Sequence, residues 1–204
     1  MSILITGVAG FIGSSVARAL LEQGESVAGV DNLNDYYDVG LKRARLERLK
    51  AYGAFAFDKI DITDKDAMFA FFEAHRDATG IVHLAAQAGV RYSLKNPFAY
   101  ISSNVYGHTV VMEGARKLPQ LRHVVYASSS SVYGTNAKLP FSVADRVDAP
   151  SSLYAATKRS DELISHTYAH LYRIPLTGLR FFTVYGPWGR PDMALFKFTK
   201  AMIE

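Results

Sequence analysis

The sequence contains no cysteine, which excludes disulfide bonds and thiolate chemistry and suits the reducing cytoplasm. It also has no apolar run close to the ~20 residues that a membrane-spanning helix needs. No basic stretch precedes the hydrophobic residues of the N-terminus, so we expect no signal peptide. These absences favour a cytoplasmic protein without a membrane partner.

Positive charge is in only modest excess, with a formal net charge of +4 at pH 7. Nucleic-acid binding needs a concentrated basic face, and residues 42–50 form the one stretch that approaches this. We interpret it as a helix in which Leu41, Leu46 and Leu49 pack inward while the charged side chains face solvent. The sequence therefore predicts no nucleic-acid partner.

Composition is that of a globular chain, with 204 residues, 49% of them hydrophobic and 21% charged. Alternating strand and helix patterns predict an α/β fold with a doubly wound, Rossmann-type, mostly parallel sheet. Because a hydrophobic segment over 3–5 leads into glycines at 7, 10 and 13, a pattern typical of dinucleotide binding, we expect residues 1–182 to form a dinucleotide-binding domain and residues 183–204 to begin a substrate-binding region. The chain ends inside an expected helix without a capping glycine, so we expect this region to be truncated, with most of a substrate-capping part missing.

The N-terminal segment Ile3–Gly13 is a buried-strand pattern that leads directly into Gly7, Gly10 and Gly13. Glycines at this spacing allow a tight turn from strand to helix and a close approach of the backbone to a pyrophosphate. The free N–H groups and the positive end of the helix dipole then face the phosphate charge.

The residues after this turn support a dinucleotide site. Apolar residues recur at helical spacing from Phe11 onward, Gly24 ends the helix, and a strand over 26–30 leads to Asp31. A carboxylate at this position accepts hydrogen bonds from ribose hydroxyls and repels a 2′-phosphate, which favours NAD over NADP.

The rest of the chain continues the alternation of strands and helices. We expect strands over 54–57, 80–84, 123–127 and 175–182, and helices over 64–75, 96–117, 152–171 and from residue 194. The connection over 128–151 is long, and a connection of this length is usually functional or contains further structure.

A tyrosine and a lysine, Tyr154 and Lys158, stand four residues apart and therefore on the same side of one expected helix. A cation beside a phenol favours the ionised form that accepts a proton. Ser128–Ser131 follow the strand over 123–127 and therefore lie at its carboxyl end, which is where parallel sheets bind ligands. No Gly-x-Ser-x-Gly elbow surrounds these serines, which disfavours a hydrolase.

Several motifs together resemble those of extended short-chain dehydrogenases/reductases that modify nucleotide sugars. The shared motifs are Thr6–Gly13, His83–Ala86, Ser128–Gly134 and Tyr154–Lys158. More narrowly, three segments resemble those of UDP-glucuronate 4-epimerases, namely Asp31–Asp38, Gln87–Ser93 and Phe182–Met193.

This resemblance implies NAD-dependent epimerisation of UDP-glucuronate to UDP-galacturonate through a 4-keto sugar. Tyr154 would take the proton of the sugar 4-hydroxyl while C4 gives its hydride to NAD⁺. Lys158 would hold the nicotinamide ribose and favour the phenolate, and Ser129 would hydrogen-bond the 4-oxygen. Because hydride and proton return to the other face of the sugar, NAD is regenerated in each cycle.

Binding roles also follow from the resemblance, residue by residue. The implied cofactor-binding residues are Gly7, Gly10, Phe11, Ile12, Gly13, Asp31, Asn32, Asp61, Ile62, Ala85, Ala86, Gln87, Asn104, Tyr154 and Lys158. The implied substrate-binding residues are Ser129, Ser130, Ser131, Tyr154, Thr183 and Arg190, of which Ser130, Ser131 and Thr183 would hold the substrate carboxylate. A 4-keto uronate loses CO₂ readily, so an epimerase must keep that carboxylate away from an alignment that favours cleavage.

Other functions remain open. UDP-glucuronate decarboxylases and 4,6-dehydratases resemble this chain but carry acidic residues where it has Ser130 and Ser131, which disfavours both. UDP-glucose 4-epimerases differ from this chain over residues 87–91. An NAD-binding sensor or scaffold would not need Ser129, Tyr154 and Lys158, so the presence of these three residues argues against that function. His166 and His170 have helical metal-ligand spacing but no third ligand, so we expect no metal. The family resemblance also implies a homodimer through the helices that start near Pro97 and Ser152.

Overall fold

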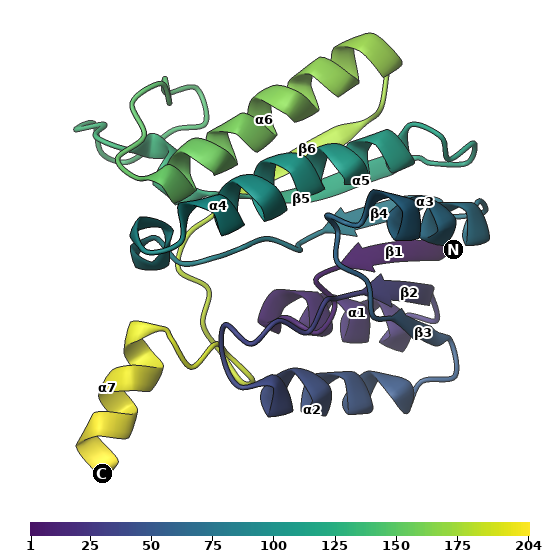
Figure 1. The fold of residues 1–204 in the computed structure, drawn as a ribbon, viewed down its shortest axis with the longest axis horizontal. Coiled ribbons are helices and arrows are strands. Elements are labelled where there is room, and N and C mark those ends of the chain that lie inside the picture. Colours follow the sequence, from purple (N-terminus) through teal and green to yellow (C-terminus); the bar gives the residue numbers. More distant parts are fainter.

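The computed structural model describes residues 1–204 and contains one parallel sheet of six strands in the order β3-β2-β1-β4-β5-β6 (Figure 1). The strands are β1 (Ser2–Thr6), β2 (Ser26–Val30), β3 (Phe55–Asp58), β4 (Gly80–His83), β5 (His123–Ser129) and β6 (Leu176–Phe181). The strand order reverses between β1 and β4, which confirms the predicted doubly wound topology.

Helices flank the sheet. They are α1 (Phe11–Glu22), α2 (Val39–Lys50), α3 (Lys65–Ala74), α4 (Pro97–Tyr100), α5 (Gly107–Ala115), α6 (Leu153–Tyr172) and α7 (Ala194–Ile203), with a π-helical turn η2 (Ile101–Tyr106) and short 3₁₀ helices η1 (Arg91–Leu94) and η3 (Ser130–Tyr133). None of them is both long enough and apolar enough to span a membrane.

Two hydrophobic cores lie on opposite faces of the sheet. The alternation along β1 places Leu4 in one core and Ile5 in the other, because successive side chains of a strand point to opposite faces. The Leu4 core contains the apolar faces of α3 and α5, and the Ile5 core contains those of α1 and α2. Buried apolar surface on both faces explains why the central strand β1 carries consecutive hydrophobic residues over 3–5.

Three of the expected helices begin next to a side chain that caps them. Asp64, Asn96 and Ser152 each accept a hydrogen bond from a backbone N–H in the first turn of α3, α4 and α6. The predicted helix over 96–117 is interrupted by the π-helical turn η2. The long connection after β5 contains η3, so it does hold further structure.

One prediction for α2 is wrong. Leu46 and Leu49 are buried as expected, but Lys42 and Arg45 are also buried instead of facing solvent. Their charged groups reach hydrogen-bond acceptors on loops outside the helix, which the local pattern of the helix does not contain.

The segment after β6 crosses the carboxyl ends of the strands. In Figure 1 this yellow-green stretch leaves β6 at one edge of the sheet, passes beside α2, and continues into α7. It therefore brings residues 182–193 to the carboxyl ends of the strands, where the glycine turn also lies.

Candidate active site

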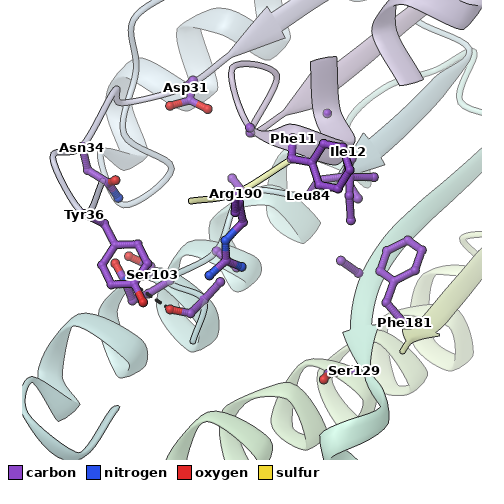
Figure 2. A pocket seen from close by; sticks show the side chains of 18 of the residues that line it. Phe11, Ile12, Asp31, Asn34, Tyr36, Leu84, Ser103, Ser129, Phe181 and Arg190 are labelled. Carbon is purple, nitrogen blue, oxygen red and sulfur yellow. Dashed lines mark hydrogen bonds between the residues drawn. The ribbon is translucent and has the colours of Figure 1, made fainter. Parts of the chain in front are cut away.

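A cavity lies at the carboxyl ends of the strands, around the switch point between β1 and β4. Figure 2 shows Asp31, Asn34 and Tyr36 on one side of it, Ser129 and Phe181 on the other, and Arg190 between them. The predicted residues that line it are Gly7, Gly10, Phe11, Ile12, Gly13, Asp31, Asn32, Asp61, Ile62, Ala85, Ala86, Gln87, Ser129, Tyr154, Lys158, Thr183 and Arg190.

The glycine turn has no room for side chains. Gly7 has φ +72°, and a Cβ there would lie 2.7 Å from the backbone nitrogen of Ala85. A Cβ on Gly13 would lie 2.1 Å from the carbonyl oxygen of Gly7. Helix α1 follows, and its N-cap Gly10 offers no side-chain acceptor to the first N–H groups, which are left for an anion.

Asp31, at the end of β2, has a fixed orientation. Its Oδ2 accepts a hydrogen bond from the Ala9 N–H at 3.2 Å, and its Oδ1 accepts one from the Leu33 N–H at 2.8 Å. Burial raises the pKa of Asp31, although these hydrogen bonds and the charge of Lys42 act in the opposite direction. The carboxylate is therefore held beside the glycine turn, where an adenosine ribose fits.

Asn32 and Asp61 form a second polar pair in the cavity. The Asn32 Nδ2 donates to Asp61 Oδ2 at 2.8 Å, and the Thr63 hydroxyl and N–H both donate to Asp61 Oδ1. Burial alone would raise the pKa of Asp61, but these hydrogen bonds lower it.

Asn104 supports the cavity from behind and does not line it. Its Oδ1 accepts a hydrogen bond from the Gln87 N–H at 2.8 Å, and its Nδ2 donates to the Gln87 carbonyl at 3.1 Å and to Thr157 Oγ1 at 3.0 Å. The π-helical turn therefore presents a side chain that fixes the loop over 85–88 against α6.

Ser129, Tyr154 and Lys158 all line the cavity, and Figure 2 shows Ser129 on the side away from Asp31. The Lys158 Nζ donates to the Ala127 carbonyl at 2.9 Å and to Asp161 Oδ2 at 3.1 Å. An ammonium group has three N–H donors, so one is left for a ligand in the cavity. The Ser129 Oγ accepts a hydrogen bond from the Ser131 N–H at 3.2 Å, and the Ser129 hydroxyl hydrogen can be donated elsewhere.

Ser130 and Ser131 do not line the cavity. They belong to η3, which begins directly after Ser129 at the end of β5. Their contact with a substrate carboxylate stays a prediction, whereas Thr183 lies in the cavity wall.

His83, at the end of β4, is a packed side chain. It is 4% exposed, and its Nδ1 lies 2.6 Å from Thr6 Oγ1. Burial lowers the pKa of His83 well below its usual value, and the neighbouring His108 and Lys158 act in the same direction.

Sequence reasoning missed several cavity residues, namely Asn34, Tyr36, Tyr37, Lys42, Ile60, Leu84, Ala88, Ser103, Ala127, Ser128, Phe181, Phe182, Val184 and Met193. Asn34, Tyr36 and Tyr37 belong to the segment Asp31–Asp38, whose resemblance was a signal without individual roles. For Lys42, the many charged residues over 42–50 favoured a prediction of exposure, whereas this lysine is buried.

The two ends of the cavity fit different chemical groups. The glycine turn and Asp31 fit the diphosphate and ribose of a dinucleotide. The hydroxyls and ammonium of Ser129, Tyr154 and Lys158 can bind a hydroxyl group and exchange its proton. Such a site can oxidise an alcohol carbon next to a bound dinucleotide.

Comparisons with known proteins agree with this geometry. A family model described as the NAD dependent epimerase/dehydratase family matches residues 3–204. Over its full length the chain is 56% identical to Protein CapI of Staphylococcus aureus, of which it covers 60%. It is 52% identical to UDP-glucuronate 4-epimerase 3 of Arabidopsis thaliana, of which it covers 47%.

A solved structure extends the similarity to the fold. The UDP-glucuronic acid 4-epimerase of Bacillus cereus, in complex with UDP-glucuronic acid and NAD, has a TM-score of 0.87 and 36% identity. The match covers 100% of this chain and 63% of that one. The chain thus spans about half to three fifths of the length of these curated relatives. Since the family model matches nearly every residue, this chain belongs to the NAD dependent epimerase/dehydratase family.

Proposed function

We propose that the protein is an NAD-dependent epimerase that converts UDP-glucuronate to UDP-galacturonate through a 4-keto sugar. The observation that carries this proposal is a single cavity that contains both the glycine turn with Asp31 and the group Ser129, Tyr154 and Lys158. The substrate is supported by the similarity to plant UDP-glucuronate 4-epimerases and to the Bacillus cereus enzyme.

The residues present fit NAD at one end of the cavity. The turn over 7–13 would hold the pyrophosphate, Asp31 and Asn32 the adenosine ribose, and Asp61 and Ile62 the adenine side of the cavity. When bound, NAD supplies the acceptor and donor of the hydride.

Side chains of the protein itself carry out the proton transfer. The Tyr154 oxygen accepts the proton of the sugar 4-hydroxyl and returns it at the end of the cycle. The Ser129 hydroxyl donates a hydrogen bond to the 4-oxygen, and the free N–H of Lys158 binds a ribose hydroxyl.

Two further residues bind the uronate and the nucleotide parts of the substrate. Thr183 offers a hydroxyl to the sugar carboxylate, and Arg190 offers a guanidinium to a phosphate or the carboxylate. We infer that residues 183–204 begin a substrate-binding region, because Thr183, Val184, Arg190 and Met193 line the cavity from that side.

A homodimer is part of the proposal. Large apolar side chains are exposed on the helical stretch over 97–106 and on α6. Phe98 is 81% exposed and Leu163 is 53% exposed. A second copy packed on these helices would bury them.

The test is to incubate the full-length protein with UDP-glucuronate and to follow the products by NMR. Formation of UDP-galacturonate without added oxidant supports the proposal. UDP-xylose would identify a decarboxylase, epimerisation of UDP-glucose alone a UDP-glucose 4-epimerase, and NAD binding without any turnover a sensor or scaffold. Each of these three results would overturn it.

A further inference from the structure

Arg45, in the middle of α2, is a fully buried cation that reaches three separate loops. It is 1% exposed, yet no carboxylate lies within ion-pair distance of its guanidinium. Five hydrogen bonds satisfy it instead, all donated to neutral oxygens: the Ala9 carbonyl at 3.1 Å, the Tyr37 hydroxyl at 2.7 Å, the Trp188 carbonyl at 3.2 and 2.6 Å, and the Gly189 carbonyl at 3.2 Å.

This arrangement is costly unless every donor is used. Desolvating an unpaired cation costs several kcal/mol, and only well-placed acceptors offset that cost. The planar guanidinium presents five donors in a fixed fork, so it fits a set of converging oxygens that a lysine cannot match. The position of Arg45 therefore depends on the loops, and the loops in turn are held together by Arg45.

Besides Arg45, the turn around Trp188 has one close contact with α2, in which the Arg48 guanidinium lies 4.6 Å from the centroid of the Trp188 ring. No residue over 182–193 is buried, so no hydrophobic core holds this segment. The backbone hydrogen bonds of residues 183–193 run only within the segment or into the start of α7, such as Gly189 N–H to the Gly186 carbonyl at 3.1 Å. The two carbonyls bound by Arg45 are thus a main attachment of this turn to the body of the protein.

A second attachment lies a few residues further along. The Tyr36 hydroxyl donates to Asp192 Oδ2 at 3.2 Å, and the Arg190 Nε donates to Asp192 Oδ1 at 3.0 Å. The Arg190 guanidinium also lies over the Tyr36 ring, 6.0 Å from its centroid. Arg190 therefore lies along the chain between the two attachments, one made by Arg45 of α2 and the other by Tyr36.

We propose that Arg45 is a positioning residue that, with Tyr36, holds the turn over 186–192 so that Arg190 points into the cavity. Through the Ala9 carbonyl the same guanidinium is tied to the glycine turn, so the dinucleotide side of the cavity sets the position of the substrate side. This inference rests on the proposed function, in which Arg190 binds the nucleotide sugar.

The test uses Trp188, the only tryptophan of this chain, in the full-length protein with Arg45→Lys. For a full-length protein with further tryptophans, these are first replaced by phenylalanine. Loss of the fork frees the turn, so we expect Trp188 emission to shift to the red and acrylamide quenching to increase about twofold. We also expect KM for UDP-glucuronate to rise about tenfold, while kcat stays within about threefold and bound NAD is unchanged, since a misplaced Arg190 weakens substrate binding.

Two further variants make the result decisive. Arg43→Lys on the exposed side of α2 is the matched control and should behave like the wild type. Tyr36→Phe removes the hydrogen bond to Asp192 and keeps the ring. It should raise KM about threefold, and it decides the question if Arg45→Lys does not fold.

The outcomes separate this inference from the proposed function. Unchanged Trp188 quenching in the folded variants, or increased quenching with an unchanged KM, would overturn the positioning role. A wild-type protein that leaves UDP-glucuronate unconverted would overturn the proposed function instead, and the quenching comparison would still decide whether Arg45 holds the turn.

Discussion

Tyr154 is the residue at which proton transfer and ligand binding can be separated. Replacing it with phenylalanine keeps the ring in the cavity and removes the only atom that accepts the proton. We expect Tyr154→Phe to lower kcat by about 10³-fold, the scale of a lost general base, while NAD stays bound. Turnover is measured by NMR and bound NAD by its absorbance after denaturation. Tyr52→Phe, on the surface at the Glu22 contact, is the control, and undiminished turnover by Tyr154→Phe would exclude the mechanism.

At Gly13, the size of one methyl group decides whether the turn can form. A Cβ would lie 2.1 Å from the Gly7 carbonyl oxygen, and backbone cannot move away cheaply. We expect Gly13→Ala to weaken NAD binding by about 100-fold or more, since the turn must open to admit the methyl group. Gly53→Ala, where no atom lies within 4 Å of the added Cβ, should bind like the wild type in calorimetric titration. Equal affinities for both variants would rule out the glycine turn as the phosphate cradle.

Among the elements, α5 and α6 are joined by a buried polar contact that makes stability depend on pH. The His108 Nε2 lies 2.9 Å from Ser165 Oγ, and burial, with the charge of Lys158, lowers the pKa of His108 to about 3. Between the usual pKa of histidine and this value, the unfolded chain binds a proton that the folded chain does not. The contribution of His108 to stability is therefore present above pH ~6.5 and is lost as the pH falls toward 3.

His108→Gln should remove this dependence and keep a group that can bond to Ser165. We expect the wild type to lose about 2 kcal/mol more unfolding free energy than the variant between pH 7 and pH 5. Urea unfolding at the two pH values measures the difference, with the exposed His170→Gln as control. Equal losses in wild type and His108→Gln would mean that His108 takes up its proton over the same pH range in the folded and the unfolded chain, which would contradict a lowered pKa.

At the scale of the whole molecule, the exposed apolar side chains of α4 and α6 predict assembly. Each charge introduced at a buried apolar contact is unpaired and opposes association. We expect the double variant Phe98→Glu and Leu163→Glu to sediment as a monomer under conditions in which the full-length wild type is a dimer. Val143→Glu, at a side chain 85% exposed on the loop after β5, should leave the dimer intact. A double variant that still sediments as a dimer would place the interface elsewhere.

The order of the elements could be predicted because its signals are local. Strand and helix periods, the capping residues Asp64, Asn96 and Ser152, and the glycine turn all act within a few residues of the chain. The same holds for Tyr154 and Lys158, whose spacing alone places them on one side of α6. The interruption at η2 could not be read from the pattern, because Asn104 is drawn to Gln87 by a tertiary contact.

Sequence alone therefore determined the α/β class, the glycine turn with Asp31, and the serine, tyrosine and lysine of the candidate site. Tertiary structure decided which charges are buried and which segments meet. Arg45 binds carbonyl oxygens 143 and 144 residues further along the chain, and no local period records such a pairing. The physical reason is desolvation: a charged side chain faces solvent by default, and it is buried only where distant parts of the fold supply enough hydrogen-bond acceptors.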